Sequence, residues 1–394
     1  MQSVLTIICI YLHPYVRTGG HRRYLELVRG LAARGHRCVL FADPRLSADL
    51  PVVNVVPLHP SQQSFFKSLP LPKSTRFAAA VRTALRRGAV QAADLVLVFG
   101  ETHFAAARVV SRRLRIPMLF AFRSLPVDVG NIELAQGGKS ALRSLVIRLR
   151  VAKYRLYERA VSRHAARIVF QSGFDRDRYL SRVPRAAAIA RVIRGNIAEP
   201  WFPASARHTN RSTGLSTILC IGAISERKGV AWLVNAFLQV AGDFPTLRLD
   251  IAGTGGLRTV LEQRVAAAGL SQRVRFLGHV TDPLSLIAAA DLLVVPSLFD
   301  SYPNTVLEAL HVGTPVIASR VGGIPDMLEH HELLFPPADA SAIAGRIRLL
   351  ATDPAAYRRA RDLCGRRRSY FEFDWPAEWE RVMREMVGQG SGEK

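Results

Sequence analysis

Apolar residues occur in short continuous runs along the whole chain, and each run is followed by a segment with helical periodicity. Continuous runs of Val, Ile, Leu and Phe are typical of strands that are buried on both faces, as in a parallel sheet covered by helices. The pattern therefore predicts two doubly wound α/β domains, one in each half of the chain. The predicted strands are 4–12, 38–44, 93–100, 117–122 and 167–172 in the first half, and 217–224, 247–253, 274–280, 291–297 and 314–319 in the second.

The pattern also predicts where the domains begin and end. We expect an N-terminal domain at 1–198, a second domain at 199–372, and a C-terminal helix at 373–394 that packs on the N-terminal domain. The segment 192–216 marks the boundary because it is polar, contains Pro200 and Pro203, and shows little periodicity.

Composition agrees with a globular protein of two domains. The chain has 394 residues, of which 49% are hydrophobic, and it contains no run of about 18 apolar residues that would predict a membrane span. The apolar run at 3–12 lacks a basic leader and a cleavage site, so it is predicted to be a first buried strand rather than a signal peptide. The four cysteines form no CxxC pair, so we expect reduced, buried thiols in a cytosolic protein.

The distribution of charge distinguishes the two halves of the chain, because nearly all of the excess positive charge lies in the first half. Residues 1–200 contain 33 Lys and Arg against 11 Asp and Glu, a balance of +22, whereas residues 201–394 contain 21 against 20, a balance of +1. Net charge indicates partners rather than fold. The first half is therefore expected to favour an anionic surface, such as a phospholipid face, a diphosphate-linked lipid or nucleic acid.

Two turns at the ends of predicted strands have the chemistry of an anion site. In IGAISERKGV, residues 221–230, Gly222 lets the backbone approach a ligand, and Arg227 and Lys228 stand where a helix start would point its amides at a phosphate. In DIAGTGG, residues 250–256, Gly253 begins a turn that is only half of a dinucleotide fingerprint. Each turn alone is equally compatible with a structural role, as a solvated basic turn or a tight connection.

The strongest signal is the stretch DSYPNTVLEAL, residues 300–310, which follows the predicted strand 291–297. In open α/β sheets, ligands bind at the carboxyl ends of the strands, so Asp300 and Glu308 are expected to point toward one pocket on either side of the turn at Pro303. A carboxylate accepts two hydroxyl hydrogen bonds, which suits a vicinal diol on a ribose or a sugar ring. Singly, each acid is explained as a turn residue or a helix-face acid; together with the two glycine-rich turns, they predict a ligand site.

In this order the motifs resemble those of the family 4 retaining glycosyltransferases, which have the GT-B fold of two Rossmann-like domains facing across a cleft. The resemblance is close over about 215–385 and looser in the first half, where RTGGHRRYLELVRGLAARGHRCVLF at 17–41 and VIRGNIAEPWFPA at 192–204 carry it. It implies transfer of a sugar from a nucleoside diphosphate sugar with retention of the anomeric configuration.

The resemblance also implies roles for individual residues. Glu308 would hold the nucleotide ribose, and Asp300 would hold the donor sugar at a position where the family usually has the longer Glu. Lys228 matches the family's diphosphate-binding Lys, and we expect Arg227 to replace an Arg that is Ala223 here. The other implied donor-binding positions are Gly19, Gly20, Gly222, Gly253, Val280, Ser301, Tyr302, Pro303, Asn304 and Thr305.

In the first domain, Arg123 stands where many family members have a His after the fourth strand. The implied catalytic residues are therefore Asp300, Lys228, Arg227 and Arg123, with Arg123 also a candidate for binding an acceptor anion. The histidines His13, His21 and His103 look scattered and lack the spacing of metal ligands, and RRLR at 112–115 is predicted to be solvated surface.

The basic stretch 140–167 is predicted to be a helix that docks on anionic lipid. Leu142, Leu145, Leu149 and Leu156 recur at helical spacing, so this face is expected to pack against the protein, while a stripe of arginines (Arg148, Arg155, Arg159 and Arg163) lies on another face. Each basic group near an anionic membrane contributes about 1 kcal/mol, so several suffice for reversible attachment. The alternative is an ordinary solvated face.

These observations predict a glycosyltransferase that is peripheral on the inner face of the cell membrane, with the nucleotide on the second domain and the acceptor on the first. The expected acceptor is a lipid-linked glycan or an envelope polysaccharide precursor. Lys228, Arg227 and the loop amides would offset the charge of the leaving diphosphate, so no metal or other cofactor is expected. A nucleotide-sugar epimerase and a non-catalytic sugar-nucleotide-binding subunit stay open as alternatives. Nucleic acid is not expected as a partner, because the basic stripe has no interleaved aromatic residues.

Overall fold

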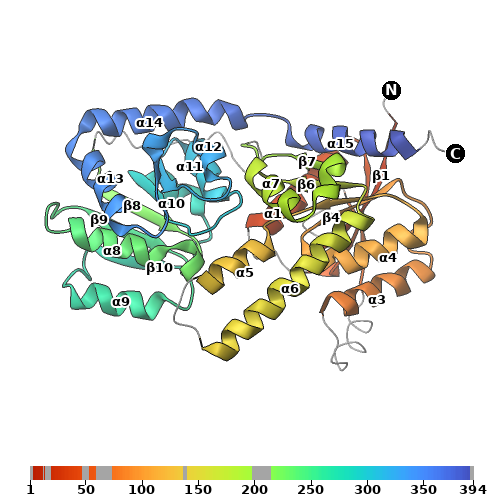
Figure 1. The fold of residues 1–394 in the computed structure, drawn as a ribbon. Helices are drawn as coiled ribbons and strands as arrows, with labels where there is room; N and C mark the ends of the chain where they lie inside the picture. The colour runs from red at the N-terminus through yellow and green to blue at the C-terminus, as the bar shows by residue number, and fades with distance from the viewer. Residues whose placement is uncertain are drawn as a thin grey trace. The chain divides into compact units, whose positions relative to one another are not determined.

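The computed structural model describes residues 3–11, 13, 19–46, 53–58, 73–135, 140–197 and 214–390. The chain divides into two compact units (Figure 1). The first comprises 1–127, 149–194 and 374–394, and the second comprises 128–148 and 195–373. The domain boundary predicted at 198/199 lies outside the described residues and stays a prediction.

The first unit contains a seven-stranded sheet in which every pairing is parallel. The strand order β3-β2-β1-β4-β5-β6-β7 reverses direction between β1 and β4. The strands are β1 (Thr6–Tyr11), β2 (Arg37–Ala42), β3 (Asn54–Pro57), β4 (Leu95–Phe99), β5 (Met118–Ala121), β6 (Arg167–Phe170) and β7 (Ala190–Val192). Its helices are α1 (Gly19–Ala33), α3 (Lys73–Arg86), α4 (Phe104–Leu114), α5 (Pro126–Ala135), which runs into the second unit, α6 (Ala141–His164), α7 (Gly173–Arg182) and α15 (Trp375–Gly390).

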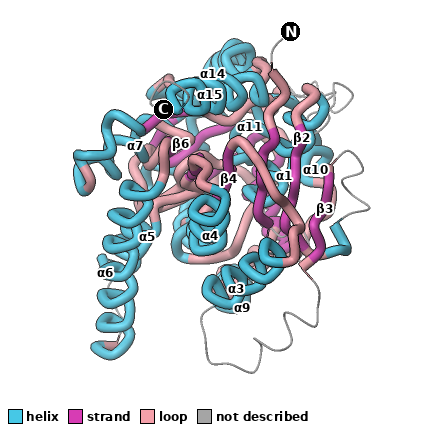
Figure 2. Tube along the Cα trace, turned by 90° about the vertical axis from the view of Figure 1, so that its right-hand side faces the viewer, coloured by secondary structure: helices cyan, strands magenta, loops and turns pink. Residues whose placement is uncertain are grey.

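Helices cover both faces of this sheet (Figure 2). On one face, α3, α4, α6 and α7 contribute Val81, Val110, Val161 and Tyr179 to a single core with the strands. On the other face, α1 and α15 pack together. Arg34 of the loop after α1 holds α15 there through ion pairs with Asp374 and Glu380. Asp374 also caps α15, because its Oδ1 accepts a hydrogen bond from the amide of Ala377 at 3.0 Å.

The second unit contains a six-stranded parallel sheet with the order β10-β9-β8-β11-β12-β13, which reverses between β8 and β11. Its strands are β8 (Thr217–Ile221), β9 (Arg248–Ala252), β10 (Val274–Gly278), β11 (Leu292–Val295), β12 (Val316–Ser319) and β13 (Leu334–Phe335). Its helices are α8 (Val230–Val240), α9 (Arg258–Ala267), α10 (Pro283–Ala289), α11 (Asn304–Val312), α12 (Ile324–Leu328), α13 (Ala340–Thr352) and α14 (Pro354–Arg368).

The two sheets confirm the predicted fold class of two doubly wound α/β domains. All ten predicted strands are present, and the four cysteines are buried thiols, as expected. The strands that the pattern missed are β3, β7 and β13, which have four, three and two residues and lie at sheet edges. Such short segments are too brief to show a continuous apolar run.

The packing predicted for α6 is wrong, because the leucine face is exposed instead of buried. Relative exposure is 73% for Leu142, 53% for Leu145, 63% for Leu149 and 65% for Leu156. A different face packs, and its buried residues are Ile147, Val151, Glu158 and Val161. Helical spacing identified a common face correctly, but it does not say which face meets the protein. Although α6 has 24 residues, no described helix is long and apolar enough to cross a membrane.

Candidate functional site

The candidate site of the second unit lies at the carboxyl edge of its sheet, where the strand order reverses. Ligands of open α/β sheets bind at such a point because the loops of the two neighbouring strands leave in opposite directions. The loop after β8 carries Arg227 and Lys228, and the loop after β11 carries Asp300. The fold therefore brings together two motifs that are more than 70 residues apart in the sequence.

An ion pair joins these two loops. The ammonium group of Lys228 contacts Oδ2 of Asp300, and the two side chains are only 23% and 12% exposed. The hydroxyl of Ser297 lies 3.4 Å from the same carboxylate oxygen. A cation and a carboxylate thus share one partly shielded position, and their assignments to a phosphate and a sugar stay predictions.

Arg227 ties the loops together through the backbone. Its Nη1 donates to the carbonyl oxygen of Phe299 at 3.1 Å, and its own carbonyl accepts from the amide of Leu298 at 2.8 Å. One contact of the guanidinium and one of the backbone therefore tie Arg227 to the loop after β11, at residues just before Asp300 in the sequence. One N–H of the Arg227 side chain is already used by the carbonyl of Phe299.

Backbone-to-backbone packing sets the shape of this edge. Gly253 has a φ of 139°, and a Cβ there would collide with the carbonyl oxygen of Gly222. Gly322, with a φ of 56°, lies equally close to the carbonyl oxygen of Asp300. Only glycine fits either position, because both the positive φ and the contact exclude a side chain. Sequence reasoning identified Gly222 and Gly253 but missed Gly322, which lies in the segment RVGGIPDMLEH at 320–330.

The segment that precedes α11 is mostly buried at the same edge. Ser301 and Tyr302 are buried, and the Ser301 hydroxyl has no hydrogen-bond partner among the described residues. Pro303 precedes the first residue of α11, so the amides of Asn304 and Thr305 fall in the first turn, whose N–H groups have no carbonyl partner within a helix. These amides suit an anion, as predicted.

Two further predicted residues keep their assignments as predictions. Glu308 is half-buried one turn into α11, and Val280 is half-buried beyond the end of β10. Both lie at or next to elements of the second sheet's carboxyl edge.

In the first unit, Arg123 lies at the carboxyl edge of the sheet. This side chain follows β5 and lies against the start of α1, where a Cβ on Gly20 would stand 2.6 Å from the Arg123 Nε. The neighbouring Gly19 is exposed at the first residue of the helix. Burial lowers the pKa of Arg123, while Glu101 and Tyr11 act in the opposite direction. The predicted residues Gly19, Gly20 and Arg123 are thus neighbours.

The structure corrects the view that the first-unit histidines are scattered. The rings of His13 and His21 stack with centroids 4.4 Å apart, and His103 lies 5.6 Å from His13. Tyr11, the last residue of β1, contacts all three rings. His13 and His103 each follow a strand, and the strand order of the folded sheet makes these two strands neighbours at the point where the order reverses.

The surroundings of His103 perturb its titration. It is buried, and its Nδ1 lies 2.7 Å from the carbonyl oxygen of Phe99. Burial lowers its pKa to about 4, and the nearby His13 and Arg123 act in the same direction. His103 is therefore neutral at pH 7. Within the described ranges, no cluster of three His, Cys, Asp or Glu side chains has the arrangement of a metal site.

Comparison with known proteins adds two family matches. Residues 18–195 match the model described as glycosyl transferase 4-like domain, and residues 216–353 match glycosyl transferases group 1. The glycogen synthase of Mycobacterium tuberculosis (strain CDC 1551 / Oshkosh) is 32% identical over 189 residues, which cover 47% of this chain and 45% of the relative. The match thus spans about half the length of that relative.

Solved structures agree over nearly the whole chain. Sucrose-phosphate synthase from Thermosynechococcus elongatus has a TM-score of 0.73 at 23% identity and covers 98% of both chains. HepE from Anabaena, solved in complex with UDP-glucose, has a TM-score of 0.71 at 18% identity and covers 98% of this chain and 100% of its own. At these identities the likeness shows the fold, which is the GT-B type predicted from the sequence.

Proposed function

We propose a specific reaction for this chain, which belongs to the group 1 glycosyltransferases of family 4: it moves a sugar from a nucleoside diphosphate sugar to a glycan or lipid-linked acceptor and retains the anomeric configuration. The observation that carries the proposal is the Lys228–Asp300 ion pair at the strand-order reversal of the second unit. The likeness to HepE, which was solved with UDP-glucose, supports a nucleoside diphosphate sugar as donor.

The donor would lie along the carboxyl edge of the second sheet. Its diphosphate would meet Lys228, Arg227 and the first amides of α11, while Asp300 accepts hydrogen bonds from hydroxyls of the sugar and Glu308 from the ribose. Donors that are already in place stabilise charge as it develops on the leaving diphosphate, without reorganisation during the reaction. We propose that these cationic and amide groups suffice, so that transfer does not depend on a metal.

The first unit would hold the acceptor. Arg123 offers a buried positive charge for an acceptor anion, and His103 is neutral at pH 7 beside His13 and His21. A neutral imidazole can accept a hydrogen bond from an acceptor hydroxyl and so position it for attack on the sugar. We therefore extend the proposed site to the histidine cluster, which sequence reasoning had set aside.

The decisive variant is Asp300→Asn, which keeps the side-chain shape and removes the charge. We expect sugar transfer to fall by about 10²–10³-fold, because the carboxylate contacts both the sugar and Lys228. Binding of the bare nucleotide should persist, since Asp300 is not assigned to it. Asp250→Asn is the matched control, because Asp250 in β9 of the same sheet is paired with Arg275, away from the site. Transfer that survives in Asp300→Asn would contradict the assigned role.

The two alternatives give different results in the same assay. A panel of nucleoside diphosphate sugars is first screened for the donor that raises the melting temperature, since a ligand of the native state stabilises it. An epimerase would convert that sugar nucleotide with no acceptor present. A non-catalytic subunit would bind it with neither transfer nor conversion.

We also propose that α6 attaches the protein to an anionic bilayer at the inner face of the cell membrane. The exposed leucine face of the helix, together with Val146, forms one stripe, and arginines flank it on both sides. Its one acid, Glu158, is buried and bonded to Arg182 at 2.7 and 2.8 Å, so the outer surface of α6 is entirely basic and apolar. Apolar residues bordered by basic ones are typical of helices that lie in a membrane interface.

Flotation with vesicles tests this attachment. Replacing Leu142, Leu145 and Leu149 with Ser should reduce binding to anionic vesicles by at least about tenfold, because each loses its buried apolar area in the bilayer. Val260→Ser combined with Leu349→Ser is the control, since both side chains are exposed in the second unit. Unchanged binding of the triple variant, or equal binding of the native protein to neutral and anionic vesicles, would contradict the proposal.

A further inference from the structure

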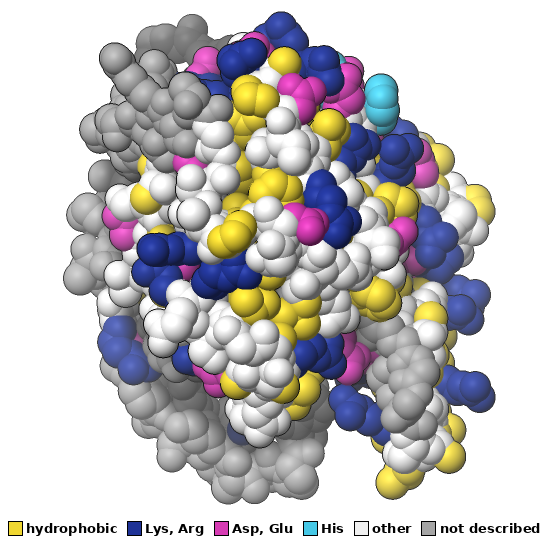
Figure 3. Space-filling view, turned by 90° about the vertical axis from the view of Figure 1, so that its left-hand side faces the viewer, with side chains coloured by type: hydrophobic (Ala, Val, Ile, Leu, Met, Phe, Trp, Pro, Cys, Tyr) yellow, Lys and Arg dark blue, Asp and Glu magenta, His cyan; other side chains and the backbone are white. Residues whose placement is uncertain are grey.

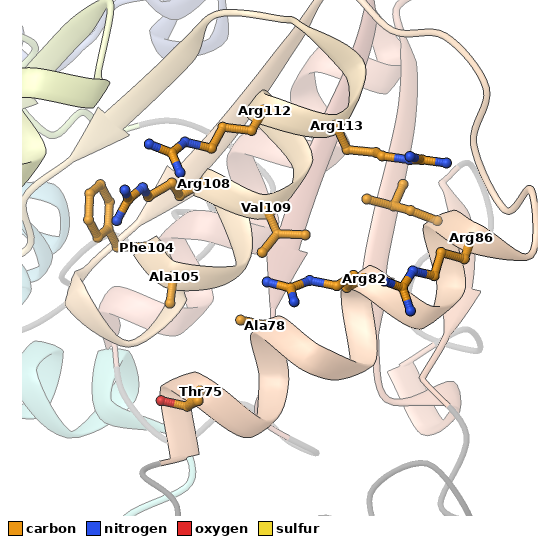
Figure 4. Close-up of a pocket in the computed structure, with 11 residues that line it drawn as sticks. Thr75, Ala78, Arg82, Arg86, Phe104, Ala105, Arg108, Val109, Arg112 and Arg113 are labelled. Carbon is orange, nitrogen blue, oxygen red and sulfur yellow. The ribbon is translucent and has the colours of Figure 1, made fainter.

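A groove of about 580 Å³ lies between α3 and α4 of the first unit, and neither the cluster histidines nor Arg123 lines it. Five arginines line it, and they come from both helices. Figure 4 shows them around the groove, with Arg82 and Arg86 on α3 and Arg108, Arg112 and Arg113 on α4. The sequence had suggested only solvated surface at 112–115.

The positive charge of this groove is not compensated within the described parts of the chain. No carboxylate lines it, and none of the five arginines forms an ion pair with a described residue. The Nε of Arg108 is buried without a hydrogen-bond partner there. Guanidinium groups gathered along one groove repel one another unless an anion binds among them, and each matches phosphate oxygens through paired N–H donors.

Between the arginines the groove is apolar. Ala78 and Leu85 of α3 and Phe104, Ala105 and Val109 of α4 contribute to its lining (Figure 4). A fully polar ligand, such as free phosphate, would gain nothing from these apolar side chains. A phosphate group that is attached to a hydrocarbon tail would contact both the cationic and the apolar parts.

The groove adjoins the C-terminal part of α6. The Phe104 ring packs against Tyr157 of α6, with centroids 5.2 Å apart, and against His164 at 6.3 Å. Burial lowers the pKa of His164, and the charges of Arg108 and Arg112 lower it further. The groove arginines therefore border the basic helix proposed above to meet the membrane.

We infer that this groove binds the headgroup of a membrane lipid that carries a phosphomonoester or a diphosphate, with more than one negative charge. Five guanidinium groups offer more donors than a singly charged phosphodiester uses, so they favour the more highly charged headgroup. The apolar lining accommodates the first part of the lipid tail. The site selects among anionic lipids, whereas α6 supplies attachment, and neither depends on sugar transfer.

Vesicle binding tests this inference. Phosphatidylcholine vesicles receive either phosphatidic acid or phosphatidylserine, adjusted to the same surface charge. The native protein should bind the phosphatidic acid vesicles about tenfold more tightly. Arg82→Gln combined with Arg112→Gln should remove this preference of about tenfold, because both side chains line the groove that would hold the phosphomonoester. Binding to phosphatidylserine vesicles should stay within about twofold, because the phosphodiester headgroup does not use the groove and α6 keeps its attachment. Both side chains are exposed, so the variant should fold, which circular dichroism checks.

The control is Arg248→Gln combined with Arg358→Gln, which removes the same charge from exposed positions of the second unit and should keep the preference. Three outcomes would overturn the inference: no preference in the native protein, an equal loss on both vesicle types in the groove variant, or binding of pyrophosphate in solution that is as tight as binding to the vesicles. The α6 serine variant distinguishes the two proposals, since it should weaken binding to both vesicle types equally.

Discussion

The two units share one topology but build their sites in different ways. In each, a parallel sheet reverses its strand order near the middle, and candidate residues follow the two central strands. In the second unit, glycine contacts between loop backbones define the site, and a single ion pair crosses it. In the first unit, side chains define it: stacked imidazoles and Arg123 packed over Gly20. A site built by backbone contacts tolerates few substitutions at its glycines, whereas a site built by side chains allows its residues to be replaced without a change in the backbone.

The same contrast holds for their surfaces. The face of the second unit shown in Figure 3 has basic and acidic side chains interspersed, in agreement with its near-neutral balance. The first unit carries the unpaired arginines of the α3–α4 groove and most of α6. A mixed surface favours solubility, while a basic one favours anionic partners. This division agrees with the proposed function, in which the second unit binds the donor and the first unit meets the membrane and the acceptor.

The largest expected effect is on the free energy of unfolding, and it should distinguish the site built by backbone contacts from the site built by side chains. Gly253→Ala places a Cβ against the carbonyl of Gly222 at a φ of 139°, so we expect a loss of about 3 kcal/mol or more in the free energy of unfolding. Gly20→Ala meets only the Arg123 side chain, which can move, so the expected loss is about 1 kcal/mol or less. Urea unfolding of both variants measures the difference. Similar losses would show that the first-unit site is as rigid as the second.

The next prediction concerns the loss of stability at low pH. His103 has a pKa of about 4 when folded, against about 6.5 when unfolded, so only the unfolded state takes up a proton between these values. Stability should therefore fall as the pH drops below 6.5, by up to about 3 kcal/mol near pH 4. His103→Gln, which removes this group, should lose less stability than the native protein between pH 7 and pH 5. The exposed His279→Gln in the second unit is the control, and it should follow the native protein.

The smallest effect tests how α15 is attached to the first unit. Burial raises the pKa of Glu380, but hydrogen bonds from Arg34 and Arg384 outweigh it and lower the pKa to about 2. Its contribution is thus present above about pH 4.5 and is lost as the pH falls toward 2. At pH 7, Glu380→Gln should cost about 1–2 kcal/mol. Glu378→Gln breaks only the exposed pair with Arg381 on the same helix and should cost about 0.5 kcal/mol or less. Equal losses would contradict a specific role for Glu380.

Much of the second-unit site was predictable because its parts are local in the sequence. Lys228 and Asp300 each lie in a short motif of a strand, a turn and a helix, and parallel topology brings the carboxyl ends of such strands together. The histidine cluster was missed because His13, His21 and His103 belong to three segments, none of which forms a motif alone. Only the strand order makes them neighbours.

The sequence by itself determined the α/β class, the ten longer strands and the residues that join across the second sheet, because continuous apolar runs and glycine-rich turns are local properties. The tertiary structure decided which face of α6 is buried, since the helix has a second apolar face at Ile147 and Val151 and periodicity cannot choose between the two. It also decided that arginines of α3 and α4 share one groove, because helix packing sets which side chains converge.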